Sequence, residues 1–301
     1  MHGWIILDKP LGLGSTQGVS AVKRALRDGG YGKFKVGHGG TLDPLATGVL
    51  PIAIGEATKL AGRMLDSDKV YEFTIAFGAQ TDTLDLEGKV IAESTVRPTF
   101  AQVEGVLAHF TGAIEQVPPA YSALKVDGER AYDLARAGAE VVLASRSVTI
   151  HRLHPHHWDI PNNPATLFNE ITLTAHVFKG TYIRSLARDI ALALGTVGHV
   201  SMLRRTKAGP FGLADAISLD KVSELGHARA LEDKLLPLRA GLDDIPALSL
   251  SPDQAGLLRQ GRVLIGIAVN DGPYFAMLED IPVALVEAET GEIRVSRGFN
   301  L

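Results

Sequence analysis

The sequence contains no cysteine. This absence excludes disulfides, cysteine-ligated zinc, iron–sulfur clusters and every mechanism with a thiol nucleophile. The sequence also lacks long apolar runs, since no stretch approaches the roughly 18 uninterrupted apolar residues that a membrane span needs. Its first twelve residues hold Asp8 and Lys9 in place of an apolar targeting segment. We therefore expect a soluble, cytoplasmic protein with no membrane partner.

The sequence also has no net positive charge. The formal net charge of the 301 residues is −4, which alone argues against a nucleic-acid partner, because phosphate binding usually leaves a basic footprint. The charge is unevenly distributed, however. Residues 1–70 carry +3 and residues 179–210 carry +5, whereas residues 71–178 and 211–301 carry −6 each. If the two positive blocks share a face, an anionic ligand has a place to bind, although an ordinary solvated face would show the same count.

The apolar pattern predicts a mixed α/β fold of the α+β type. Apolar residues make up 46% of the chain, enough for a proper core. Strand patterns cover residues 4–7, 49–54, 69–77, 89–93, 141–150, 171–178 and 200–207, and helical spacing covers residues 19–26, 98–110, 129–136 and 183–194. Near residue 241 the pattern changes to short segments broken by Gly, Pro and Asp. This change predicts a large domain over residues 1–240 and a small β-rich module over residues 241–301.

Three patterns that suggest other sites have simpler explanations. The glycines between residues 12 and 18 lack the order of a phosphate-binding loop. The four histidines within residues 151–157 are accompanied only by Asp159, so we expect a solvated loop or strand edge there and no metal site. The acidic residues within 82–87 could form the paired carboxylates of a glycosidase, but a polar turn between two strands explains them more simply.

Asp43 is the centre of the best candidate site. It follows a glycine-rich stretch that is typical of a loop and precedes Pro44. Because a residue before proline is pushed out of the helical region, Asp43 should be held extended at the tip of this loop. Its carboxylate, an arginine from a basic segment and tyrosines that can stack on a base would together form a site. A carboxylate that merely caps the loop is the alternative.

The run Gly-His-Gly-Gly-Thr-Leu-Asp-Pro-Leu-Ala-Thr-Gly-Val-Leu-Pro over residues 37–51 resembles the signature loop of the TruB family of tRNA pseudouridine synthases. Other family motifs occur in the same order, and the resemblance covers roughly residues 3–220. These motifs are Asp8-Lys9-Pro10, Gly55-Glu56-Ala57-Thr58-Lys59, Lys69-Val70-Tyr71, residues 116–125, Lys179-Gly180-Thr181-Tyr182-Ile183-Arg184 and Leu203-Arg204-Arg205.

The resemblance implies a pseudouridine synthase fold, with a large mixed and mainly antiparallel sheet flanked by helices and a C-terminal PUA-like RNA-binding module. It implies isomerisation of uridine 55 in the T-loop of tRNA to pseudouridine, in which the flipped base is cut from its sugar at N1, turned and rejoined through C5. No cofactor or metal is implied. The missing cysteine fits, because the family uses an aspartate where uridine-C5 methyltransferases use a thiolate.

The resemblance also assigns roles near the base. Asp43 resembles the family's catalytic carboxylate, acting as a nucleophile at the sugar C1′ or as a base that removes a sugar proton, and both roles stay open. Arg184 resembles the ion-pair partner of that carboxylate. Tyr71 matches the tyrosine that stacks on the flipped base, Leu203 the apolar wall on its other side, and Tyr182 a second aromatic near the site.

The remaining assignments concern the RNA. His38 resembles the loop histidine that helps to hold the T-loop open. Predicted phosphate contacts, each of which could instead be an ordinary surface charge, are Lys9, Lys59, Lys125, Arg204 and Arg205. We expect a monomer that binds the T-stem-loop of tRNA and has no obligate protein partner. The alternatives are a relative that modifies another RNA, including the guide-RNA-dependent members, and a non-catalytic tRNA-binding or folding chaperone.

Overall fold

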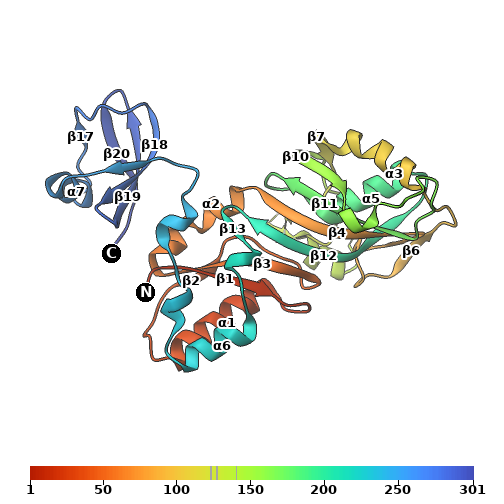
Figure 1. The fold of residues 1–301 in the computed structure, drawn as a ribbon, viewed down its shortest axis with the longest axis horizontal. Helices are drawn as coiled ribbons and strands as arrows, with labels where there is room; N and C mark the ends of the chain where they lie inside the picture. The colour runs from red at the N-terminus through yellow and green to blue at the C-terminus, as the bar shows by residue number, and fades with distance from the viewer. Residues whose placement is uncertain (123, 127, 140) are drawn as a thin grey trace. The chain divides into compact units, whose positions relative to one another are not determined.

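The computed structural model describes residues 1–122, 124–126, 128–139 and 141–301 (Figure 1). Contacts along the chain divide it into two compact units. The first comprises Met1–Leu42, Val49–Leu65 and Gly209–Leu301, and the second comprises Asp43–Gly48 and Asp66–Ala208. The chain thus enters and leaves the second unit twice, and the boundary predicted near residue 241 falls within the first unit.

The second unit is built on a mainly antiparallel sheet. Its order is the start of β3, then β12, β4, β11, β10 and β7, and β3 pairs with β12 in parallel. The other neighbours are antiparallel. The strands are β3 (Ala46–Ile54), β12 (Gly198–Ala208), β4 (Lys69–Phe77), β11 (Glu170–Val177), β10 (Arg146–Pro155) and β7 (Gly112–Gln116). This agrees with the predicted mixed, mainly antiparallel sheet.

Helices α3 (Phe100–Leu107) and α5 (Ile183–Ala193) cover one face of this sheet. Phe73 and Ile75 alternate along β4 and are fully buried against Leu186 of α5 and Val103 of α3. Each such side chain contributes on the order of 1.5–3 kcal/mol when it is removed from water. The opposite face is polar, and the hydroxyls of Thr74 and Thr172 lie 3.0 Å apart on it. The period-2 pattern of β4 therefore fixes which face carries the core.

Gly48 marks the point where β3 passes from one unit to the other. Its φ angle is +100°, a conformation that side chains rarely adopt, and a Cβ atom there would lie 2.1 Å from the carbonyl oxygen of Arg205. Only glycine allows β3 to approach β12 so closely. This requirement explains one glycine of the sequence run over residues 37–51.

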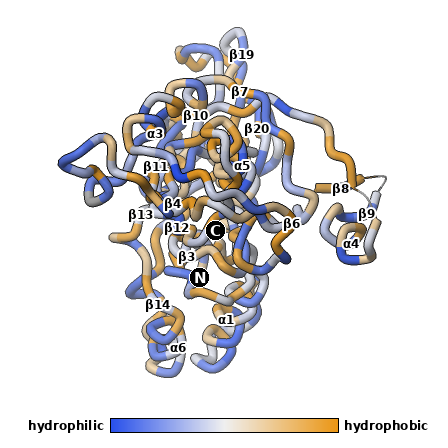
Figure 2. Tube along the Cα trace, turned by 90° about the vertical axis from the view of Figure 1, so that its right-hand side faces the viewer, coloured by the Kyte–Doolittle hydropathy of each residue, from blue (hydrophilic) through white to orange (hydrophobic). Residues whose placement is uncertain are grey.

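The first unit contains a second group of strands and a pair of helices. Strands β14, β1 and β3 lie in this order, with β2 added to β3 and β15 to β1. Helices α1 and α6 run side by side (Figures 1 and 2), and a Cβ atom at Gly226 would lie 2.8 Å from that of Ala25. These elements are β14 (Ile217–Ser218), β1 (Gly3–Lys9), β2 (Val36–His38), β15 (Leu236–Pro237), α1 (Ser15–Asp28) and α6 (Leu219–His227).

The C-terminal residues form a small sheet with its own core. The strand order is β16, β18, β19, β20, β17, and α7 packs beside it. Its core includes Ala255, Val283 and Ile293. The elements are β16 (Ala247–Ser249), β18 (Gly272–Leu278), β19 (Ile281–Glu289), β20 (Glu292–Gly298), β17 (Leu264–Ile265) and α7 (Pro252–Arg259). The predicted β-rich character of this region is confirmed.

The remaining elements are short. Among the described residues, no helix is long and apolar enough to cross a membrane. The predicted helix over residues 129–136 is shorter, because β9 occupies its start. These elements are α2 (Ala61–Asp66), α4 (Ala131–Arg136), β5 (Ala79–Thr81), β6 (Val90–Glu93), β8 (Lys125–Val126), β9 (Glu129–Arg130) and β13 (Phe211–Gly212).

Lys69, the first residue of β4, is 7% exposed. Burial, followed by the nearby charge of Arg205, lowers the pKa of Lys69 from 10.5 to about 8, while Asp66 and Asp68 oppose this shift. Between pH 8 and 10.5 the unfolded chain therefore binds a proton at this lysine that the native protein does not bind. In that range the contribution of Lys69 to the free energy of unfolding rises with pH.

We expect the stability difference between the wild type and Lys69→Met to depend on pH. The free energy of unfolding of the wild type, relative to that of the variant, should rise by about 2 kcal/mol between pH 7 and pH 10. Urea denaturation of both proteins at the two pH values measures this change. A difference that stays constant with pH would contradict the lowered pKa.

Candidate active site

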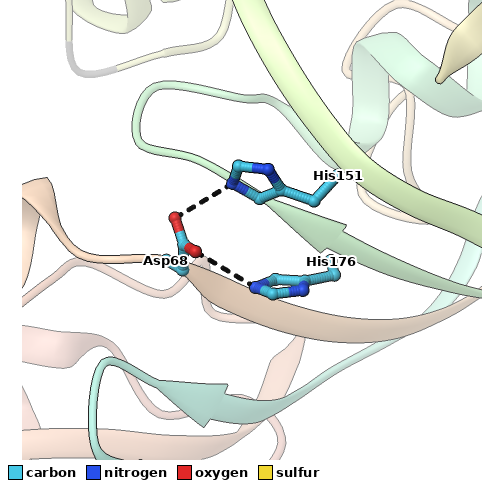
Figure 3. A group of neighbouring side chains, drawn as sticks. All are labelled: Asp68, His151 and His176. Carbon is cyan, nitrogen blue, oxygen red and sulfur yellow. Dashed lines mark hydrogen bonds and ion pairs between the residues drawn. The ribbon is translucent and has the colours of Figure 1, made fainter. Parts of the chain in front are cut away.

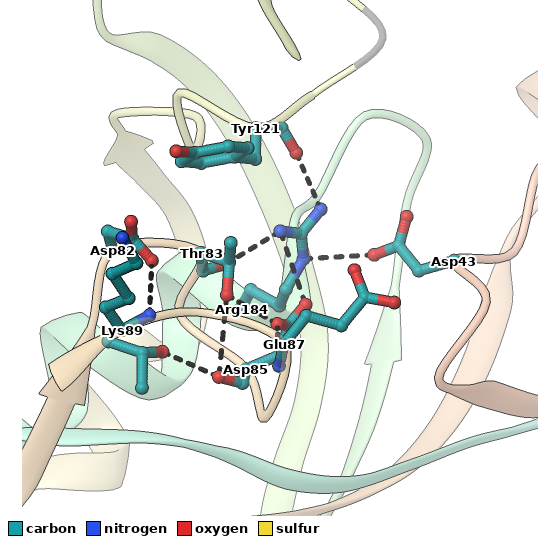
Figure 4. Close-up of polar contacts among 9 residues, drawn as sticks. Asp43, Asp82, Thr83, Asp85, Glu87, Lys89, Tyr121 and Arg184 are labelled. Carbon is teal, nitrogen blue, oxygen red and sulfur yellow. Dashed lines mark hydrogen bonds and ion pairs between the residues drawn. The ribbon is translucent and has the colours of Figure 1, made fainter. Parts of the chain in front are cut away.

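Arg184 lies in the first turn of α5. Its side chain is buried, and it donates hydrogen bonds to other groups of the protein. Its Nη1 donates to the carbonyl of Thr83 at 2.8 Å, and its Nη2 donates to the carbonyl of Tyr121 at 2.9 Å. Its Nε lies 3.0 Å from Oδ2 of Asp43 (Figure 4). Each of the three guanidinium nitrogens therefore has an acceptor, which fixes the plane of the group. The helical pattern over residues 183–194 did not predict this burial.

Asp43 presents its carboxylate at the tip of the predicted loop. Leu42 before it is held at both backbone groups by the hydroxyl of Ser15, at 2.8 and 2.9 Å. The turn after Asp43 is closed by its own carbonyl, which accepts from the backbone N–H of Ala46 at 3.0 Å. The side chain of Asp43 is 39% exposed and pairs with Arg184. The carboxylate is thus accessible to solvent, and it pairs with an arginine side chain, unlike a carboxylate that merely caps its own loop.

A second carboxylate, that of Asp85, also faces Arg184. Its Oδ2 lies 3.6 Å from Nη1 of Arg184, and its side chain is only 10% exposed. Its Oδ1 accepts from the hydroxyl of Thr83 at 2.6 Å and from the backbone N–H of Glu87 at 3.0 Å. A polar turn was expected here, and that expectation missed the burial of Asp85. Leu84 has a φ angle of +64°, which no simple sequence pattern signals.

The negative charges of this cluster compensate the positive charge of the buried Arg184 guanidinium. A cation in the first turn of a helix meets the positive end of the helix dipole, which is unfavourable. Asp43 and Asp85 supply two negative charges on different sides of the guanidinium. A lysine could not replace Arg184, because one ammonium cannot reach acceptors in three directions within a plane. With the guanidinium between them, these carboxylates are not arranged as ligands of a common metal ion.

A small recess lies beside the ion pair. Asp43, Asp85 and Arg184 line it together with Leu203 of β12, which pairs with Ala46 of β3. An accessible carboxylate therefore stands next to an apolar wall. A ligand that packs on this wall would bring its polar bonds close to the carboxylate.

Tyr71 lies on the same face of the sheet as Leu203. It stands two residues before Phe73 on β4, and Phe73 pairs with Leu203. Both Tyr71 and Leu203 are partly buried and pack against the core that includes Phe73. The two predicted base-contacting residues thus come from neighbouring strands and share one face.

Tyr182 lies directly before α5, and its ring packs against an arginine side chain. The guanidinium of Arg146 stands 4.8 Å from the ring centroid of Tyr182. The backbone of Tyr182 is bonded in both directions to the side-chain amide of Gln116, at 2.8 and 3.1 Å. These contacts tie the start of α5 to the proline-containing loop after β7. In that loop Tyr121, which the sequence did not single out, supplies a carbonyl to Arg184.

Two of the predicted phosphate contacts are buried. Lys9 has no exposed surface, and its ammonium donates to the carbonyls of Pro10 and Leu13 at 3.1 and 2.6 Å. Arg205 is 1% exposed and lies within β12. A phosphate in solution cannot reach either charge without a rearrangement. Their burial argues against the predicted role, and local charge counts could not reveal it.

The other predicted RNA contacts are more accessible. The ammonium of Lys59 pairs with Glu56 at 2.6 Å and keeps 27% of its side chain exposed. Lys125 is exposed on β8, and Arg204 is partly buried on β12. His38 lies at the end of β2 and is partly buried, in a strand where a loop was predicted. Their contacts with RNA stay predictions.

Comparison with known proteins identifies the family of the chain. Residues 27–183 match the family model described as TruB family pseudouridylate synthase (N terminal domain), and residues 184–243 match tRNA pseudouridylate synthase B C-terminal domain. A protein of Novosphingobium aromaticivorans named tRNA pseudouridine synthase B is 67% identical, over 100% of this chain and 98% of its own. One of Zymomonas mobilis with the same name is 60% identical, over 100% and 96%.

Solved structures show a similar fold. A chain in a crystal structure of a Cbf5-Nop10-Gar1 complex has a TM-score of 0.72 and 25% identity, covering 99% of this chain and 84% of its own. A chain in a structure of an H/ACA RNP bound to a substrate RNA containing 2'-deoxyuridine has a TM-score of 0.70 and 23% identity, over 99% and 85%. With both family models and close relatives matched along its length, the chain belongs to the TruB family of pseudouridylate synthases.

Proposed function

We propose that the protein converts uridine 55 in the T-loop of tRNA to pseudouridine. The observation that carries this proposal is the accessible carboxylate of Asp43, held 3.0 Å from Arg184 beside a recess with an apolar wall. Relatives 60–67% identical to this chain are named tRNA pseudouridine synthase B. A tRNA substrate would place the enzyme in the cytoplasm.

Asp43 is proposed to start the reaction at the sugar. As a nucleophile, its carboxylate attacks C1′ and the N1–C1′ bond breaks, leaving an acylated sugar and a uracil anion. As a base, it removes the proton from C2′ while the N1–C1′ bond breaks, which gives a glycal and a uracil anion. The detached base then turns and C5 bonds to C1′. In the first route this step releases the Asp43 carboxylate from C1′, and in the second the proton returns to C2′. Loss of the proton on C5 completes both routes. Arg184 orients Asp43 through the 3.0 Å ion pair, because the guanidinium is itself fixed by two carbonyls.

Tyr71 and Leu203 are proposed to hold the flipped base between them. Extruding a base from its stack costs roughly a few kcal/mol, and stacking on an aromatic ring returns about 1–3 kcal/mol. The two energies are similar, so flipping needs no external energy source. Tyr182 is proposed as a more distant aromatic of the site, since its ring packs on Arg146.

Two domains and several charged side chains are proposed to bind the RNA. Residues 1–240 would form the catalytic domain, and residues 241–301 a PUA-like RNA-binding module. We propose His38 as a contact to the opened T-loop and Lys59, Lys125 and Arg204 as phosphate contacts. The protein would act as a monomer, without an obligate protein partner and without a cofactor.

Sequence identity favours this substrate over that of guide-RNA-dependent relatives. The structural neighbours from H/ACA complexes are 22–25% identical to this chain, far below the relatives named tRNA pseudouridine synthase B. A non-catalytic tRNA chaperone would need none of the ion pairs around Arg184. The arrangement of Asp43, Arg184 and Asp85 therefore favours an enzyme.

Replacing Asp43 by Asn should abolish turnover. The amide keeps the shape of the side chain but removes the negative charge that either route needs, so the rate should fall by about 10³-fold or more. Tritium release from C5-labelled uridine in a T-stem-loop measures this rate. If the wild type releases no tritium, or if Asp43→Asn releases it at the wild-type rate, the proposed function is wrong.

Tyr71→Phe separates stacking from proton removal. The phenyl ring keeps the stacking surface and loses the hydroxyl, so turnover should be retained if Tyr71 only stacks. If the hydroxyl takes part in removing the C5 proton, kcat should fall by about 10²-fold or more while the KM for the T-stem-loop changes little. Steady-state tritium release gives both constants. A raised KM with unchanged kcat would contradict both expectations, since stacking alone leaves both constants unchanged and proton removal lowers kcat.

Asp85→Asn tests the second carboxylate. Removing its charge leaves Arg184 with Asp43 alone and weakens the hold on the guanidinium, so we expect kcat to fall by about 10-fold or more with little change in KM. Asp82→Asn is the matched control, because Asp82 lies in the same turn and bonds the backbone N–H of Lys89 at 2.9 Å. Equal effects of the two substitutions would show that only the turn matters.

A further inference from the structure

Two histidines and an aspartate meet in the second unit, apart from the Asp43–Arg184 pair. Asp68 directly precedes β4, His151 lies on β10 and His176 on β11. The Nε2 atom of His151 is 3.2 Å from Oδ1 of Asp68, and the Nε2 atom of His176 is 3.2 Å from Oδ2 (Figure 3). Each oxygen of one carboxylate thus faces one imidazole nitrogen.

A β-bulge brings His151 into this cluster. Ile150 pairs with Val177 and Arg152 pairs with His176, so His151 is the extra residue between two ladder pairs. In regular alternation His151 and Arg152 would point to opposite faces, yet both are exposed. The rings of His151 and His176 consequently lie side by side, with centroids 4.9 Å apart. The backbone of two paired strands therefore holds both imidazoles in place.

We propose that Asp68, His151 and His176 form a binding site for Zn²⁺ or a similar divalent transition-metal ion. Two imidazoles and one carboxylate are a typical zinc ligand set, which leaves a fourth position to water. Around a tetrahedral zinc with bonds of about 2.0–2.2 Å, neighbouring ligand atoms lie about 3.3 Å apart. Each imidazole nitrogen lies 3.2 Å from one oxygen of Asp68, and the two distances run to different oxygens. With one ligand atom taken from each residue, the three atoms lie within 4.8 Å of one another, so small side-chain rotations would close them around an ion.

The cluster is also accessible to an ion. The side chains of Asp68, His151 and His176 are 43%, 39% and 42% exposed, so an ion can enter from solvent and the rings can turn slightly to close around it. Mg²⁺ and Ca²⁺ fit less well, because these hard cations prefer sites made of oxygen ligands alone. A bound ion would join the residue before β4 to β10 and β11, and thereby steady the start of the strand that carries Tyr71.

This site differs from the one that the sequence suggested and rejected. Within residues 151–157, His154 lies on the half of β10 that pairs with β11 alone, as expected for a strand edge. His156 is buried, beside Glu72 at 3.6 Å. Only His151 of that run joins the cluster, and its partners are 83 and 25 residues away in the sequence. The inference stands independently of the proposed function.

Direct titration of the full-length protein tests this site. Protein without a polyhistidine tag is stripped with a chelator, dialysed and titrated with Zn²⁺ by calorimetry, and with Co²⁺ by visible absorption. We expect one equivalent of Zn²⁺ to bind, and Co²⁺ to give the intense bands of a tetrahedral complex. Zinc at about 100 times its dissociation constant should raise the melting temperature by about 5 °C. Absence of saturable zinc binding would overturn the proposal.

Substitutions identify the ligands. His151→Gln and His176→Gln should each weaken zinc binding at least about tenfold, and the double variant should lose the one-equivalent site and the cobalt bands. His227→Gln, at the exposed end of α6, is the control and should bind zinc like the wild type. Metal-free melting temperatures establish that each variant is folded, and Asp68→Asn provides a ligand variant outside β10 and β11. Unchanged stoichiometry and affinity in the double variant would place the metal elsewhere.

Discussion

The ion pair between Arg184 and Asp43 is the contact on which the arrangement of the site depends. Burying a guanidinium costs several kcal/mol unless its charge and its hydrogen-bond donors are satisfied. Here the loop that carries Asp43, the turn that carries Thr83 and Asp85, and the segment that carries Tyr121 each supply a partner. Because the buried guanidinium needs a partner from each of these three segments, it fixes their positions relative to one another.

The sheet provides the rigid support for this cation. Helix α5 buries its apolar side against β4, and Ser185 next to Arg184 donates to the carbonyl of Val117 at 2.8 Å. Together with the bonds between Gln116 and Tyr182, this holds the loop after β7 against the start of the helix. Ordered loops on a regular scaffold are the usual arrangement for sites that must position a reacting group.

Periodicity predicted the regular elements well, because β4 and α5 bury one face each and their apolar spacing reports it directly. Two motifs of the family resemblance, residues 37–51 and 179–184, also predicted Asp43 and Arg184 as an ion pair, and the two side chains do form one. Three-dimensional burial was not predictable in the same way. Charged residues such as Lys9, Arg205 and Asp85 look like surface groups in the sequence. Lys9 donates to backbone carbonyls, and Asp85 accepts from a hydroxyl and a backbone N–H, so charge patterns do not reveal these partners. The bulge at His151 shifts by one residue the alternation of side chains between the two faces of the strand. A search for regular alternation does not recognise such a shift.

The division of the chain has a consequence for the order of folding. The second unit needs both Asp43–Gly48 and Asp66–Ala208, and its defining ion pair joins residues 141 positions apart. During synthesis Asp43 leaves the ribosome long before Arg184 exists. Until α5 has been made, the loop has no cation to hold it, and long-range pairings of this kind form late and slowly. The Asp43–Arg184 ion pair therefore forms late in folding, and a nascent chain that stops short of α5 cannot contain it.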